Sequence, residues 1–157
     1  MADRMRIWGV GPRLFLFSFL YSIIPIFLTS RYPEYFIVYF VPISFFKTVG
    51  IALLAVGIPF YAFSARTLLK GFKQGILCTD GVYSIVRHPL YCALIVFIIP
   101  GVLMFFRSWA LFTIPIAAYF IFKILIREEE QCLAERFGEE YLIYKSKVRA
   151  ILPFPRF

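Results

Sequence analysis

Four long apolar segments constrain what this chain can fold into. They cover about residues 11–29, 48–67, 89–106 and 108–126, and each approaches or reaches the roughly 20 helical residues that cross a hydrocarbon core. Of the 157 residues 61% are hydrophobic, and the mean hydropathy is +0.81. One soluble core of this size does not need so much apolar surface. We therefore expect an all-α, polytopic integral membrane protein.

A fifth apolar stretch, residues 33–46, lies between the first two segments. It is short and is broken by Pro33 and Pro42, so we interpret it as an interfacial or re-entrant piece rather than a full span. The expected number of spanning helices is therefore four, or five if 33–46 also crosses the membrane.

Basic residues gather on one side of this topology. Of the 17 Lys and Arg residues, 14 flank the start of the first segment, the connection between the second and third, or the end of the fourth. The positive-inside rule then places both termini in the cytoplasm. The net charge is +8, and the basic residues flank apolar runs. We therefore expect these residues to contact lipid headgroups rather than nucleic acid. The three cysteines have neither CxxC spacing nor neighbouring histidines, so we expect no metal site.

The connection between the third and fourth segments is only Phe106–Ser108, which predicts a tight antiparallel hairpin. The hairpin brings His88, before the third segment, to the same membrane face as Arg127–Glu130, at the end of the fourth. Each charged group alone suits a headgroup contact or a solvated helix end. Opposite charges at one partly desolvated mouth instead suggest a site for a zwitterionic ligand.

The chain after Glu130 is amphipathic and too polar to span a membrane. Apolar residues recur there at helical spacing and are interrupted at Gly138. We expect a cytosolic helical cap that rests on the membrane surface.

Three stretches of the sequence resemble one known family. They are "GVYSIVRHPLY" (Gly81–Tyr91), "EEQCLAERFGEEYLIYKSKV" (Glu129–Val148) and "LPF" (Leu152–Phe154). Together they are similar to the isoprenylcysteine carboxyl methyltransferases and to related membrane phospholipid methyltransferases. The resemblance covers roughly residues 75–154 and implies a cofactor-binding half there, while residues 1–70 match only in being apolar. We expect a single domain over residues 1–157, with N-terminal transmembrane helices in 1–70.

The resemblance also implies S-adenosylmethionine as cofactor, S-adenosylhomocysteine as product and a cytoplasmic active site. The implied cofactor-binding residues are Tyr83, His88, Pro89, Tyr91, Glu129 and Glu130. These residue types suit the ligand, because cationic side chains bind its carboxylate, a glutamate binds its ammonium or ribose hydroxyls, and aromatic rings bind its adenine or sulfonium. No GxGxxG follows a strand, which excludes a Rossmann methyltransferase.

The implied catalytic residues are Arg87, Arg127 and Glu130. An acceptor carboxylate is already ionised and needs a cation to hold it, such as Arg87 or Arg127. An amine or thiol acceptor needs a base instead, and Glu130 or Glu129 with a raised pKa is the candidate.

The acceptor stays open at this stage. The resemblance favours a prenylated or otherwise lipophilic substrate from the bilayer, namely the carboxylate of an isoprenylcysteine, with a phospholipid amine or a small thiol as alternatives. An NADPH-dependent membrane reductase and a non-enzymatic membrane scaffold are alternatives of other classes. The sequence leaves the oligomeric state undetermined.

Overall fold

The structure, a computed structural model, describes residues 9–151, so the LPF motif lies outside the described residues. Within this range the chain forms helices and no strands, as predicted. The elements are α1 (Gly11–Arg31), α2 (Pro33–Phe36), α3 (Ile43–Gln74), α4 (Val82–Ile85), α5 (Pro89–Cys92), the π-helix η1 (Ala93–Ile98), α6 (Ile99–Met104) and α7 (Thr113–Lys147).

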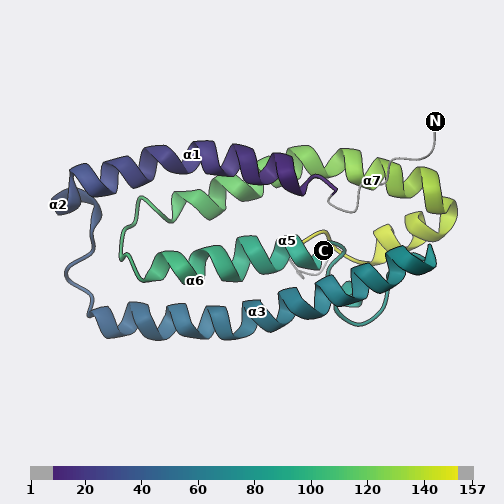
Figure 1. The fold of residues 1–157 in the computed structure, drawn as a ribbon, viewed down its shortest axis with the longest axis horizontal. Helices are drawn as coiled ribbons and strands as arrows, with labels where there is room; N and C mark the ends of the chain where they lie inside the picture. The colour runs from purple at the N-terminus through teal and green to yellow at the C-terminus, as the bar shows by residue number, and fades with distance from the viewer. Residues whose placement is uncertain (1–8, 152–157) are drawn as a thin grey trace.

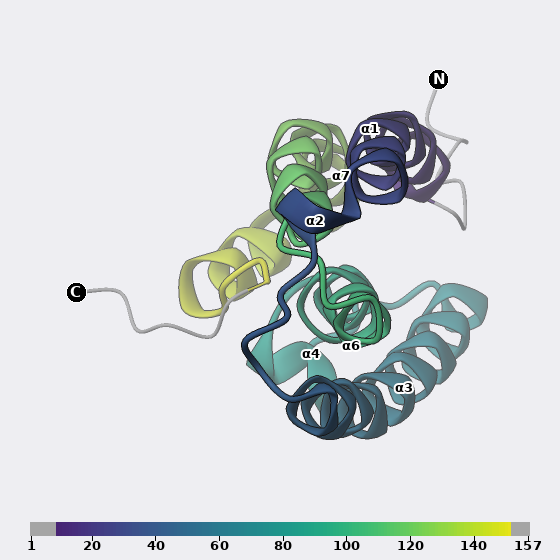
Figure 2. The same cartoon turned by 90° about the vertical axis from the view of Figure 1, so that its left-hand side faces the viewer.

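The long elements lie side by side as rods. Helices α5, η1 and α6 follow one another without a break and form one rod over residues 89–104. This rod packs against α3 on one side, and its η1 part contacts α7, which also packs against α1. Figures 1 and 2 show the arrangement, with the α5–η1–α6 rod between α3 and the α1–α7 pair.

The predicted boundaries hold to within two residues for the first and third segments, but α3 extends the second by five residues at its start and seven at its end, and the fourth also differs. Helix α7 begins at Thr113, five residues later than predicted, because residues 105–112 form turns. These turns pair with the chain after α2: Val38 N donates to the Arg107 carbonyl (2.8 Å), and Trp109 N donates to the Phe36 carbonyl (3.1 Å). Of the fifth apolar stretch only the four residues of α2 and the first turn of α3 are helical, so it forms no spanning helix.

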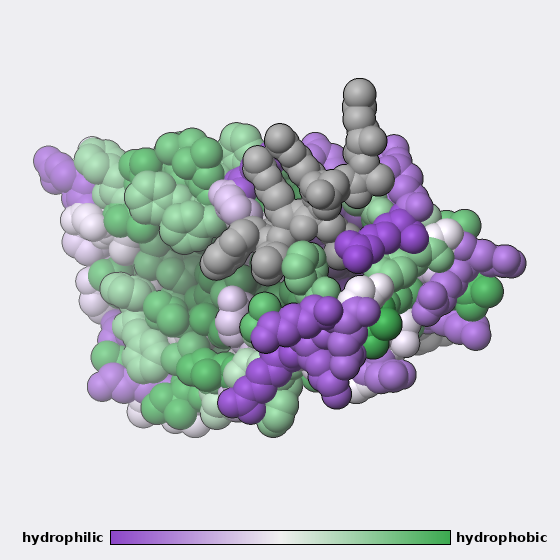
Figure 3. Space-filling view, turned by 45° about the vertical axis from the view of Figure 1, so that its right-hand side comes forward, coloured by the Kyte–Doolittle hydropathy of each residue, from purple (hydrophilic) through white to green (hydrophobic). Residues whose placement is uncertain are grey.

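Two helices, α1 and α3, are long and apolar enough to cross a membrane, and the rod over 89–104 is apolar but shorter. Large apolar side chains project from these helices and from α7, among them Phe15, Phe19, Phe63 and Ile124. Figure 3 shows hydrophobic residues over one part of the surface and hydrophilic residues gathered toward the end where α1 starts and α7 finishes. Such a division of the surface is expected of a helical membrane protein.

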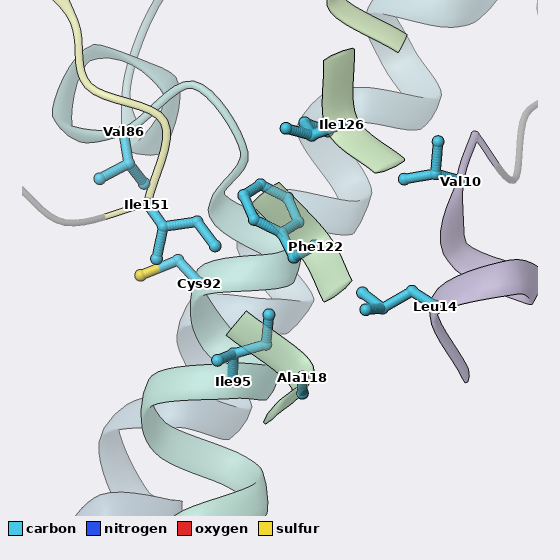
Figure 4. Close-up of a cluster of buried hydrophobic side chains, with 9 residues drawn as sticks. All are labelled: Val10, Leu14, Val86, Cys92, Ile95, Ala118, Phe122, Ile126 and Ile151. Atoms are coloured by element: carbon cyan, nitrogen blue, oxygen red, sulfur yellow. The ribbon is translucent and has the colours of Figure 1, made fainter. Parts of the chain in front are cut away.

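The buried core lies next to this hydrophilic end. Phe122 of α7 is at its centre, with Val86, Cys92 and Ile151 on one side and Val10 and Leu14 on the other (Figure 4). The core thus joins α1, α5 and α7 to the short segments that flank α4 and follow α7.

Helix α7 continues past the apolar part and breaks at Gly138, where φ is 56° and ψ is −129°. A left-handed φ strongly favours glycine, so the predicted interruption is confirmed. The last part of α7 turns Tyr141 and Tyr144 into the protein, where both are buried. These two residues of the amphipathic face therefore pack on the protein rather than on a membrane surface.

Candidate functional site

The backbone positions Arg87 and His88 at the hydrophilic end of the bundle. Val86 is extended, and its neighbours pair with the chain that follows α7: Arg87 N donates to the Arg149 carbonyl (2.7 Å) and His88 N to the Ala150 carbonyl (2.9 Å). Pro89 then begins α5, where a missing N–H costs nothing. The RHP motif is therefore a short extended segment held by the C-terminal part of the chain.

Helix α7 presents Glu130 to this segment. Phe122, Ile126 and Glu130 recur every four residues and are all buried, so they form one stripe on the inner face of the helix. Glu130 extends an apolar stripe with a carboxylate. Such a burial is tolerated only when charged partners and hydrogen bonds compensate it.

Three side chains surround Glu130 and form an ionic cluster with it. Its Oε1 accepts from Arg87 Nη2 (2.6 Å) and Nε (3.2 Å) and lies 3.3 Å from His88 Nε2, while Lys145 Nζ lies 2.9 Å from Oε2. The side chain of Glu130 is only 10% exposed. The predicted meeting of the RHP motif with the glutamates of the hairpin is thus confirmed.

The ionic cluster fixes the charge of Glu130. Burial alone would raise the pKa of its carboxyl, but hydrogen bonds from His88, Lys145 and Arg87 outweigh burial and hold the pKa well below its usual range. The expectation of a raised pKa at Glu130 is therefore wrong. A carboxylate that holds its charge this firmly is a poor base, so Glu130 is better suited to organise the site than to take a proton.

Arg87 is almost fully engaged as well. Besides its contacts to Glu130, its Nη1 donates to the Lys145 carbonyl (3.0 Å) and to the Val148 carbonyl at the end of α7. Four of its five N–H groups are thus occupied. Arg87 braces the end of α7 against the RHP segment, and its guanidinium also interacts with the Tyr141 hydroxyl.

Glu129 differs from Glu130 in keeping an accessible side. Its Oε2 accepts from Tyr91 Oη (3.2 Å) and from the backbone N–H of Val10 (3.1 Å), and its Oε1 lies 3.7 Å from His88 Nδ1. Its side chain is 24% exposed. The imidazole of His88 is buried between the two carboxylates and packs against the rings of Tyr91 and Phe122. Glu129 is therefore the carboxylate of the site that a ligand can reach.

Three tyrosines line the same end. Tyr144 Oη donates to the Tyr83 carbonyl (2.6 Å), which ties the end of α7 to α4. The hydroxyl of Tyr141 is fully buried and forms no hydrogen bond of normal geometry within residues 9–151. Burial and then the charge of Glu130 raise the pKa of Tyr141, so the phenol stays protonated and its O–H is a donor in need of an acceptor.

For two residues the position in the structure differs from what the sequence led us to expect. Arg127 lies on the exposed side of α7 and takes part in none of the ion pairs found within the described residues, so the structure does not bring it to the ionic cluster. Lys145, which the sequence analysis missed, is part of the cluster. Its position one turn after Tyr141 was the available signal, because i and i+4 share a helix face.

The fold and the site together define a helical membrane protein with a buried ionic site at one end. The family model for the isoprenylcysteine carboxyl methyltransferase (ICMT) family matches residues 51–135, more than half of the chain. The chain belongs to the isoprenylcysteine carboxyl methyltransferase family.

Comparison with individual relatives supports the same family. The chain is 40% identical over 78 residues to protein-S-isoprenylcysteine O-methyltransferase of Xenopus laevis, covering 50% of this chain and 27% of that protein. It is 33% identical over 94 residues to the Saccharomyces cerevisiae protein of the same name, covering 60% and 39%. The chain thus spans between a quarter and two fifths of the length of these relatives.

A solved structure shares the fold. The eukaryotic intramembrane Ras methyltransferase ICMT superposes with a TM-score of 0.67 at 20% identity, over 92% of this chain and 53% of that one. The likeness supports the arrangement of the helical rods in this chain.

Proposed function

We propose that this protein transfers a methyl group from S-adenosylmethionine to a lipophilic acceptor, the carboxylate of an isoprenylcysteine-like substrate. One observation carries the proposal. The RHP segment and the glutamate pair of α7 form a buried ionic cluster, and beside it Glu129 and Tyr141 can still form hydrogen bonds to a ligand. The family and the names of the relatives support the reaction class.

The residues fit the methyl donor chemically. The accessible oxygen of Glu129 suits an ammonium or ribose hydroxyls, and the buried hydroxyl of Tyr141 suits an acceptor atom such as a carboxylate oxygen. The rings of Tyr91 and His88 offer aromatic faces beside them. When bound, S-adenosylmethionine supplies a methyl group already activated by the sulfonium.

The protein's task is then to orient the reactants and to exclude water. Glu130, Arg87 and His88 hold the RHP segment against α7 and so fix the positions of Tyr91 and Glu129. An acceptor carboxylate is ionised at neutral pH and requires no base, which agrees with a site whose buried glutamate stays charged.

Lys145 is the cation best placed to receive an acceptor carboxylate. One N–H group of its ammonium contacts Glu130, which leaves the other two N–H groups to donate to a ligand. Its side chain is 42% exposed, unlike that of Arg87. In this scheme Arg87 is a positioning residue.

The membrane arrangement that fits these roles has four crossings: α1, α3, the rod over 89–104 and the apolar part of α7 up to residue 126. The end that holds the ionic cluster faces the cytoplasm, because most of the basic residues lie at that end. Arg31, Lys47 and Arg107 then lie at the other membrane face.

The test is calorimetric binding of S-adenosylmethionine and, separately, NADPH to the protein in lipid nanodiscs, followed by methyl transfer to a farnesylated cysteine. Glu129→Gln should weaken binding of the methyl donor roughly 10- to 150-fold, since a charge-assisted hydrogen bond contributes about 1.5–3 kcal/mol. Glu128→Gln is the matched control, because Glu128 is the preceding residue and forms an exposed pair with Arg13. Binding of NADPH alone would favour a reductase, and binding of neither ligand would favour a scaffold.

A further inference from the structure

An apolar groove runs along the bundle beside the ionic cluster. Its volume is about 220 Å³, and every residue that lines it is apolar: Val56, Phe60, Ile85, Val86, Cys92, Val96, Phe97 and Ile151. Ile85 and Val56 at its rim are 52% and 55% exposed, whereas Val86, Cys92 and Ile151 at its base are buried. The groove therefore opens along its length on the surface of α3, α4 and the α5–η1–α6 rod.

One end of the groove adjoins the site. Val86 directly precedes Arg87, and Ile151 directly follows Ala150, whose carbonyl accepts from His88 N. Because the backbone at Val86 is extended, neighbouring side chains point to opposite faces: Val86 faces the groove and Arg87 faces the ionic cluster. A ligand with an apolar chain and a charged head could thus contact both sides of one segment.

The other end is narrowed by two aromatic rings and then closed. Phe60 of α3 and Phe97 of η1 contact edge to face, with ring centroids 6.3 Å apart. Beyond these rings α3 packs too closely against the rod to leave room for the hydrocarbon chain of a ligand. A Cβ at Gly57 would lie 2.6 Å from Phe97 Cβ, and one at Gly50 would lie 2.8 Å from the Gly101 carbonyl oxygen. A chain that reaches this point must leave the groove sideways past Val56.

The π-helix supplies this inner wall. Residues 93–98 form η1, and Val96 and Phe97 belong to it. π-Helical segments are rare and occur frequently at functional sites. Here η1 follows α5, which begins with Pro89 of the RHP motif, and it extends from there to the narrowed end of the groove.

We propose that this groove binds the apolar chain of the membrane-borne acceptor and that Phe60 and Phe97 set how much of the chain is bound. The inference rests on the proposed function and names a determinant of specificity within it. A methylene group that moves from the bilayer into the groove leaves one apolar surrounding for another, so it strengthens binding only modestly, through closer packing, until the groove is full. Longer chains then gain nothing further, because the additional carbons lie in the bilayer.

The test measures Kd for N-acetyl cysteines that carry a geranyl, farnesyl or geranylgeranyl chain, in nanodiscs of one lipid composition. In the parent protein the Kd should fall with chain length and then level off. Phe97→Ala and Phe60→Ala should shift the levelling to a longer chain, so that the longest chain gains affinity relative to the next shorter one. Phe60→Leu and Phe97→Leu should give smaller shifts and guard against misfolding, which the Tm of each variant reports.

The matched control is Phe63→Ala, because Phe63 lies on the same helix as Phe60 but is 57% exposed. It should leave the dependence on chain length unchanged. Well-folded Phe60 and Phe97 variants with the parent's length dependence would overturn the groove proposal even if methyl transfer is intact. Conversely, a shifted length dependence without any methyl transfer would support the groove and refute the proposed function.

Discussion

The two ends of the helical bundle are closed by different chemistry. At one end Arg87, His88 and Lys145 surround Glu130. At the other, the Thr29 and Ser108 hydroxyls lie 2.8 Å apart, and backbone hydrogen bonds join residues 36–38 to 107–109. At the second end these backbone and hydroxyl groups satisfy one another, and the Nε of Arg107 is the buried side-chain atom there without a hydrogen-bond partner among the described residues. The ionic end leaves Glu129 partly accessible and the Tyr141 hydroxyl unpaired within the described residues, which is the pattern of a site that awaits a ligand.

The largest effect in this comparison is expected from Glu130→Gln. The amide keeps the shape of the side chain but leaves Arg87 and Lys145 without a counter-charge in a mostly buried place. Loss of one partner of a buried ion pair costs about 3–5 kcal/mol of the free energy of unfolding, which corresponds to a fall in Tm of roughly 6–20 °C. Thermal unfolding in nanodiscs measures it.

The control for Glu130→Gln is Glu128→Gln on the same helix turn. Its pair with Arg13 is exposed, and such pairs contribute about 0–1 kcal/mol. Equal Tm values for the two variants would mean that the ionic cluster does not hold the bundle together.

The pH dependence of stability is expected to differ between the two ends, because the ionic end contains a carboxyl group with a lowered pKa. The pKa of Glu130 is lowered in the folded protein, so its contribution is complete above the unfolded pKa near 4.3 and is lost only as pH falls below it. The Tm difference between parent and Glu130→Gln should thus stay constant from neutral pH to about pH 5 and shrink at lower pH. A difference that already shrinks between about pH 7 and 6 would contradict a lowered pKa of Glu130 in the folded protein.

At the opposite end, Ser108→Ala should have a smaller and purely structural effect. It removes one buried hydrogen bond and leaves the Thr29 hydroxyl without its partner, at a cost of about 1 kcal/mol or roughly 2–4 °C in Tm. Binding of S-adenosylmethionine should not change. The double variant Thr29→Val/Ser108→Ala should recover part of the loss, because both polar groups are then gone. A loss of ligand affinity in Ser108→Ala would show that the two ends are coupled.

The sequence predicts the convergence at the ionic end for a simple physical reason. Two apolar segments joined by a short turn must return to the same membrane face, so His88 and the glutamates meet whatever the details of packing. The start of α7 was not predictable in this way, because residues 105–112 pair with residues 36–38, which are distant in sequence.

The roles within the site were predictable only in part. Of two adjacent glutamates, Glu130 is buried because it continues the stripe of Phe122 and Ile126, and the sequence does not say which face of α7 meets the rod. The sign of its pKa shift depends on hydrogen bonds from three side chains that converge from α7 and the RHP segment. The sequence places Lys145 on the same helix face as Tyr141, but whether that face turns toward Glu130 depends on how the chain redirects at Gly138.

The smallest effect is expected from Arg127→Ala, which tests the sequence-based role of that residue against the geometry. Arg127 is exposed, and exposed substitutions usually change stability by less than about 0.5 kcal/mol. Both the Tm and the Kd for S-adenosylmethionine should therefore match the parent. Lys145→Ala provides the contrast, since it should raise the KM for a carboxylate acceptor several-fold. If Arg127→Ala instead abolished methyl transfer while the methyl donor still bound, Arg127 would hold the acceptor carboxylate, and the acceptor site would extend beyond the ionic cluster onto the exposed side of α7.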